Sequence, residues 1–138
     1  MGVVAWLTLV LAAPVARNAE SGLAPFLYAP FASICHQIPA RSISVLGHPM
    51  AVCARCFGLY LGFLLGLVVL PHWARMSGRL LMRPRLLVLF WIPLAIDLCL
   101  PNTALSRFVT GTVAAFPVAL FVWIAIEDLR LSTARSYL

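Results

Sequence analysis

The sequence contains no lysine and only four acidic residues, so all ten of its positively charged side chains are arginines. It also lacks a Gly-rich phosphate loop and a zincin H-E-x-x-H motif, which argues against the commonest nucleotide-binding and zinc-protease classes. Charged residues make up 10% of the chain and hydrophobic residues 63%, compared with about half in soluble globular domains. A soluble domain is therefore excluded. The arginines lie between apolar runs, which favours orientation in a bilayer over binding to nucleic acid.

The apolar runs predict an all-α, polytopic integral membrane protein in which residues 1–138 form a single membrane domain. About 20 apolar residues are needed to cross roughly 30 Å of hydrocarbon. Four runs are candidate transmembrane helices, at residues 2–16, 51–70, 86–100 and 108–126. The first and third are short, at about 15 residues, so they require a locally thin bilayer. The first run lacks the positively charged start of a signal peptide, and we interpret it as a retained helix.

The positions of the arginines predict the orientation of these helices, because short arginine-rich loops remain in the cytoplasm. Four of them separate the second and third runs, namely Arg75, Arg79, Arg83 and Arg85. With this loop inside, both termini are cytoplasmic, and the long segment 17–50 and the short segment 101–107 lie outside. The expected localisation is the bacterial cytoplasmic (inner) membrane, with the lipid bilayer as the main partner.

Three glycines in the second run, Gly58, Gly62 and Gly66, recur every four residues. This spacing stacks them along one face of a helix, where the backbone of another helix can approach closely in lipid. At about 100° per residue, Cys53 and Cys56 fall on nearly the opposite side. We therefore expect the glycines to pack helices and the cysteines to have a separate role.

Five potential metal ligands lie within a short part of the chain, namely Cys35, His36, His48, Cys53 and Cys56. Thiolate and imidazole donors suit a tetrahedral, borderline-soft ion such as zinc. The three cysteines supply three sulfurs, and His36, His48 or Cys99 supplies the fourth donor. A closed tetrahedron leaves no position for a substrate water. We therefore expect an extracytoplasmic zinc site, and its closed geometry favours a structural role over a catalytic one.

One acidic side chain, Asp97, lies within the predicted transmembrane helices. An ionisable group at this depth is costly unless it is paired, and Arg55 or Arg107 is the expected partner. Arg41 belongs to the same outer level. We expect these four residues to support the metal site as a polar group.

Other interpretations of the cysteines remain open. Extracytoplasmic cysteines tend to be oxidised, and C-x-x-C is also a redox motif, so the protein could be a membrane thiol-disulfide oxidoreductase with Cys53 attacking and Cys56 resolving. An inert structural disulfide is a further interpretation. A small transporter or channel has less support, because there is one intramembrane acid and no broken-helix repeat.

Three motifs resemble a bacterial family of predicted membrane proteins known as domain-of-unknown-function 2085. They are CHQIPARS at residues 35–42, GHPMAVCARCFGLYLGF at 47–63 and, more weakly, LSRFVTG at 105–111. The resemblance implies a multi-span protein whose Cys-His and C-A-R-C elements belong together. In this chain those elements are Cys35, His36, Cys53, Arg55 and Cys56. The family carries no established activity, and the small size of the chain suits an accessory subunit of a larger membrane complex.

Overall fold

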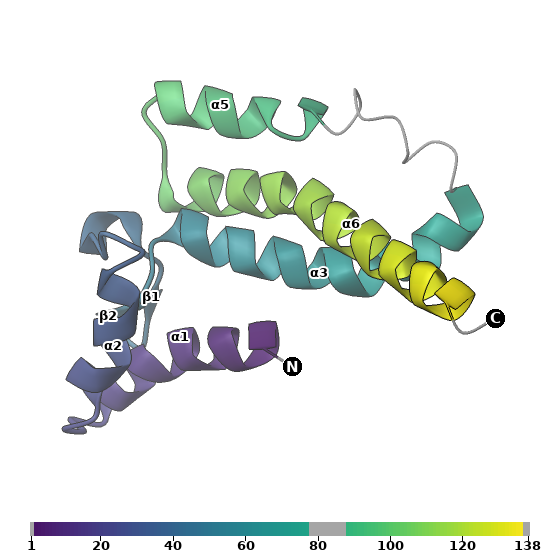
Figure 1. The fold of residues 1–138 in the computed structure, drawn as a ribbon. Helices are drawn as coiled ribbons and strands as arrows, with labels where there is room; N and C mark the ends of the chain where they lie inside the picture. Colours follow the sequence, from purple (N-terminus) through teal and green to yellow (C-terminus); the bar gives the residue numbers. More distant parts are fainter. Residues whose placement is uncertain (1, 78–87, 137–138) are drawn as a thin grey trace.

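The computed structural model describes residues 2–77 and 88–136 and is mostly helical, as predicted (Figure 1). Its elements in chain order are α1 (Gly2–Asn18), α2 (Ala24–Ala32), the 3-10 helix η1 (Pro39–Arg41), strands β1 (Ser44–Val45) and β2 (His48–Pro49), α3 (Ala54–Ser77), α5 (Ile92–Cys99) and α6 (Ala104–Ser136). The two strands form a small antiparallel hairpin, which the sequence did not predict.

Helices α3 and α6 form the centre of the molecule and run side by side, with α5 packed on α6 and α1 on α3 (Figure 1). Glycines allow the central pair to approach closely. A Cβ atom at Gly58 would overlap the carbonyl of Phe108, and one at Gly62 would overlap the carbonyl of Thr112. On the α6 side of the same contact, a Cβ atom at Gly111 would overlap the carbonyl of Arg55. The prediction that Gly58 and Gly62 pack against another helix is confirmed.

The Gly62→Val substitution should lower the free energy of unfolding by about 3 kcal/mol, the upper end of the usual cost of overpacking. The reason is that the new side chain would meet the backbone of Thr112, which cannot rotate away as a side chain would. Thermal unfolding in detergent, followed by circular dichroism, measures the effect. Gly22→Val is the matched control, because a Cβ atom at Gly22 has no neighbour within 4 Å. Equal melting temperatures for the two variants would contradict the close packing.

Within residues 2–77 and 88–136, one helix is long and apolar enough to cross a membrane, the part of α6 from Ala104 to Arg130. The prediction of four such helices is therefore not supported. The first run forms α1, whose 17 residues extend only about 25 Å, and the apolar part of α3 at Ala54–Val69 is also short. The second run was expected to begin at residue 51, but the helix starts three residues later.

The third predicted run differs most from the structure. Its described part forms α5, which has eight residues and extends about 12 Å. Pro93 occupies the first turn of α5 and Pro101 follows its extended C-cap, so proline limits the helix at both ends. The arginines expected to hold the preceding loop inside fall outside what the structure describes, since Arg79, Arg83 and Arg85 lie in 78–87 and the side chain of Arg75 is not described.

The segment between α1 and α3 is folded back on α1. Phe31 of α2 is 1% exposed and packs edge-on against Trp6, with 4.9 Å between the ring centroids. The Tyr28 hydroxyl donates a hydrogen bond to the carbonyl of Pro49 in β2. Leu46 and Gly47 form the two-residue turn of the hairpin, and both have positive φ, as the right-handed twist of the strands requires. These contacts hold the segment across the start of α3.

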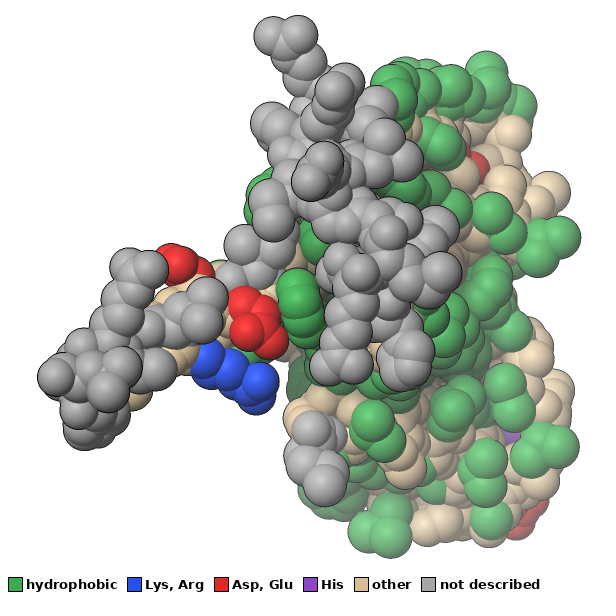
Figure 2. Space-filling view, turned by 90° about the vertical axis from the view of Figure 1, so that its right-hand side faces the viewer, with side chains coloured by type: hydrophobic (Ala, Val, Ile, Leu, Met, Phe, Trp, Pro, Cys, Tyr) green, Lys and Arg blue, Asp and Glu red, His purple; other side chains and the backbone are tan. Residues whose placement is uncertain are grey.

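Large hydrophobic side chains are exposed on several helices of the described chain. Examples are Val68 of α3 at 65%, Leu98 of α5 at 63% and Leu129 of α6 at 66%. Figure 2 shows one face on which hydrophobic side chains are widespread over the described part of the chain. Extensive apolar exposure of this kind marks contact with lipid or with another protein.

Candidate metal centre

Cys53 and Cys56 lie at the start of α3, which brings their side chains together. The Cys53 carbonyl accepts the first helical hydrogen bond, from the amide of Phe57 at 3.0 Å, so Cys53 caps the helix and Cys56 lies in its first turn. A capping residue and the residue three positions later face each other across the helix end. The C-x-x-C spacing therefore places two sulfurs at one helix terminus.

Cys35 reaches the same point from α2. Its amide donates to the carbonyl of Phe31 at 2.8 Å, which continues the last turn of that helix. The Cys35 side chain is buried, and its sulfur accepts a hydrogen bond from the amide of Cys53 at 3.1 Å. Gln37 then turns the chain away with a positive φ of 48°, and its side chain donates to the carbonyl of Tyr28. Hydrogen bonds to the backbone of α2 and to the start of α3 thus hold Cys35 in place.

The sulfurs of Cys35, Cys53 and Cys56 all lie within 4.8 Å of one another, and we call these three residues the cysteine cluster. All four cysteines of the chain are free thiols. In a tetrahedral zinc site with Zn–S bonds of about 2.3 Å, sulfurs are separated by roughly 3.8 Å. The cluster therefore needs little movement to hold one ion.

The other predicted donors do not join the cluster. Among the described residues, the three cysteines alone form a group with ligand atoms this close together. His48 is held in strand β2, paired with Val45 across the hairpin. Cys99 is exposed on α5, and His36 is exposed next to Cys35. The prediction of a complete four-donor site is thus met for three sulfurs only, although His36 lines the cavity described next.

A cavity of about 230 Å³ lies beside the cysteine cluster. Its wall includes all three cysteines and His36, together with three arginines from different elements: Arg41 of η1, Arg55 of α3 and Arg107 of α6. The structure therefore brings Arg41, Arg55 and Arg107 to the same cavity as the three sulfurs. They also give the cavity a positive charge that the predicted metal site alone did not require.

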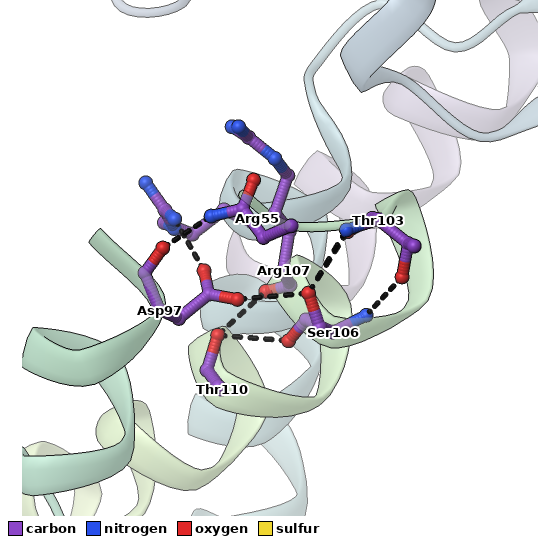
Figure 3. Close-up of polar contacts among 7 residues, drawn as sticks. Arg55, Asp97, Thr103, Ser106, Arg107 and Thr110 are labelled. Carbon is purple, nitrogen blue, oxygen red and sulfur yellow. Dashed lines mark hydrogen bonds and ion pairs between the residues drawn. The ribbon is translucent and has the colours of Figure 1, made fainter. Parts of the chain in front are cut away.

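Arg55 pairs with Asp97, which links the first turn of α3 to α5 (Figure 3). Their side chains are 19% and 4% exposed, so the pair is largely shielded from water. This settles the predicted alternative between Arg55 and Arg107. In Figure 3 the Arg107 side chain points away from Asp97.

Two residues near Asp97 were not predicted to take part. The Ser106 hydroxyl donates to the second carboxylate oxygen of Asp97 at 2.8 Å, and the Asn102 amide donates to its backbone carbonyl. Ser106 and Thr103 also cap the start of α6 reciprocally, each hydroxyl accepting the other residue's amide. The sequence T-A-L-S after Pro101 and Asn102 is a recognisable helix start, so this signal could have drawn attention to Ser106.

The electrostatics of the cluster favour a thiolate at Cys53. The Cys56 thiol donates a hydrogen bond to the Cys53 sulfur, and although burial acts in the opposite direction, the pKa of Cys53 is lowered to about 5. A further contribution comes from the start of α3, where the helix dipole stabilises negative charge. A sulfur of this kind is both a good metal ligand and a reactive nucleophile.

Residues 35–121 match a family model described as a predicted membrane protein, DUF2085. The matched region covers more than half of the chain and contains the cysteine cluster, Asp97 and Arg107. The chain belongs to this family. It is therefore a predicted membrane protein from a family of unknown function. In the structure of this chain, three close cysteines could hold a metal ion.

Two curated relatives are uncharacterised proteins of archaea. The chain is 38% identical to one from Methanocaldococcus jannaschii over 102 residues, which cover 70% of this chain and 65% of that protein. It is 53% identical to one from Methanothermobacter thermautotrophicus over 32 residues, or 23% of this chain and 29% of that protein. The chain thus spans less than two thirds of either relative. The description of the family as bacterial is wrong for these relatives. No solved structure matches the chain.

Proposed function

We propose that the cysteine cluster holds one zinc ion whose role is structural. The observation that supports this most strongly is the convergence of three sulfurs within 4.8 Å from two separate segments of the chain. A zinc ion there would fasten the segment after α2 to the start of α3, across a loop of 17 residues between Cys35 and Cys53. The mechanism resembles that of other structural zinc sites, where binding energy contributes directly to folding.

The fourth zinc ligand in this proposal is His36, which completes the closed set of four protein donors that a structural zinc site requires. His36 is adjacent to Cys35 and lines the same cavity as the three sulfurs. Its exposed side chain can change rotamer without disturbing packed neighbours. His48 and Cys99 are not proposed, because neither lies with the cluster in the described structure.

We further propose that the protein crosses the bacterial or archaeal cytoplasmic membrane more than once, with the cluster on the outer side. Support comes from Figure 1, where α1 begins and α6 finishes toward the same end of the molecule, opposite the start of α3. Exposed apolar side chains on α3, α5 and α6 suit lipid or a partner subunit. An accessory role in a larger membrane complex fits these surfaces.

Elemental analysis of the purified full chain, combined with thiol counting, tests the zinc proposal. We expect about one zinc per chain, with the cluster thiols unreactive until a chelator is added. X-ray absorption spectroscopy should then show three sulfurs at about 2.3 Å and one nitrogen donor. Protein without metal in which cysteines are paired in disulfides would overturn the proposal.

A second candidate function is thiol-disulfide exchange, and the lowered pKa of Cys53 favours it. In this reaction the Cys53 thiolate attacks a disulfide of a partner protein, forms a mixed disulfide and releases one partner thiolate. The Cys56 sulfur then loses its proton, attacks Cys53 and releases the second partner thiolate. The result is a Cys53–Cys56 disulfide and a reduced partner. The same thiol count separates this function from a zinc site.

A further inference from the structure

The cavity beside the cysteine cluster has more positive charge than its neighbours neutralise. Of its three arginines, Arg55 is paired with Asp97. Arg41 and Arg107 make no ion pair with any residue that the structure describes. A zinc ion bound by three thiolates carries a net charge of −1. Without a metal, a cluster of one thiolate and two thiols also carries a charge of −1. Two unpaired guanidinium groups therefore leave a surplus of positive charge in either case.

We propose that this cavity binds an oxyanion of the phosphate type through Arg41 and Arg107. Arginine suits this role because its planar group presents several N–H donors that match phosphate oxygens. Arg41 comes from η1 and Arg107 from α6, so the two groups reach the cavity from separate elements and can contact different oxygens of a tetrahedral anion. The site goes beyond the proposed zinc site and does not depend on it.

The size and rim of the cavity fit this ligand. Its volume of about 230 Å³ accommodates a phosphate group together with a few waters, each of which takes about 30 Å³ in the liquid. Ile34 and Ile38 also line it, and they are 52% and 38% exposed. Arg55 also lines the cavity, and its Nε atom is buried without a hydrogen-bond partner among the described residues. Both a free phosphate and the phosphate of a lipid headgroup have the required chemistry.

Binding of inorganic phosphate to the full chain in detergent, measured by calorimetry at constant ionic strength, tests the site. Arg41→Gln and Arg107→Gln should each weaken binding at least about 10-fold, the contribution expected of a hydrogen bond to a charged group. Arg130→Gln is the control, because Arg130 is 74% exposed near the other end of α6 and pairs with Glu127. It should leave binding unchanged.

A second measurement distinguishes the source of the phosphate. Native mass spectrometry counts the phosphatidylglycerol molecules retained by the unchanged protein and by its Arg41→Gln, Arg107→Gln and Arg130→Gln variants. Circular dichroism and elemental analysis check the fold and the zinc content of each protein. Arginine-dependent binding of inorganic phosphate supports a soluble ligand, and arginine-dependent retention of lipid alone supports a headgroup. If neither probe binds, or if binding is the same in Arg41→Gln and Arg107→Gln as in the unchanged protein, the proposal is wrong. The zinc content reports separately on the metal site.

Discussion

Replacing Cys56 with serine is expected to reduce zinc from about one ion per chain to below about 0.1. A hydroxyl is a far weaker zinc ligand than a thiolate, and even the loss of an outer partner of a ligand costs about 10- to 100-fold in affinity. Cys35→Ser and Cys53→Ser should behave alike, because the three sulfurs lie within 4.8 Å of one another and share one ion. Elemental analysis after gel filtration measures the loss.

The same experiment has a stability readout. A ligand that binds only the folded state stabilises it by about 2.7 kcal/mol at 100 times its dissociation constant. Added zinc should therefore raise the melting temperature of the unchanged protein and leave that of Cys56→Ser where it is. The control is Cys99→Ser, since Cys99 is an exposed thiol on α5 outside the cluster. Zinc retained by Cys56→Ser, or lost from Cys99→Ser, would contradict the assignment of ligands.

The cysteine cluster was predictable in part because local geometry determines two of its members. A C-x-x-C pair before an apolar run predicts two sulfurs at one helix start, and the structure places Cys53 and Cys56 there. Cys35 is different, because 17 residues separate it from Cys53 and spacing alone does not fix how such a segment folds. Its position depends on the packing of α2 against α1, in particular on the buried ring of Phe31.

The fourth donor could not be predicted for the same physical reason. His48 follows Gly47, which forms the tight turn of the hairpin and so fixes His48 in strand β2 opposite Val45. Cys99 was also predicted as a possible fourth donor, and helix geometry explains why it lies outside the cluster. Two positions correspond to about 200° of rotation, so Asp97 and Cys99 cannot face the same neighbour. Asp97 faces Arg55, and Cys99 is exposed.

The number of membrane crossings could not be predicted from the sequence, because hydropathy reports composition and not helix length. The run at 86–100 is as apolar as a transmembrane helix, yet two prolines confine its described helix to eight residues. The run at 108–126 lies wholly inside a longer helix and was predicted correctly as a candidate membrane crossing. Apolar runs therefore identified the membrane class more reliably than the number of crossings.

Asp97→Asn is expected to lower the free energy of unfolding by about 3–5 kcal/mol, the usual cost of removing one partner from a buried ion pair. Asparagine has nearly the same shape as aspartate, so packing is preserved, but Arg55 keeps its charge at 19% exposure without a counter-charge. Thermal and denaturant unfolding in detergent measure the change. The zinc content below the melting temperature should stay near one, because Asp97 is not in the cysteine cluster.

Glu127→Gln is the matched control for this prediction. It removes an acid from the pair with Arg130, whose N–O distance is 3.8 Å and whose side chains are 74% and 39% exposed. Exposed pairs of this kind contribute between about 0 and 1 kcal/mol, so its unfolding should be nearly unchanged. The double variant Arg55→Met with Asp97→Leu should recover much of the stability lost in Asp97→Asn, because no uncompensated charge remains. If the double variant is as unstable as Asp97→Asn, the loss comes from the hydrogen bond of the Ser106 hydroxyl to the Asp97 carboxylate, and the ion pair is not what holds α5 to α3.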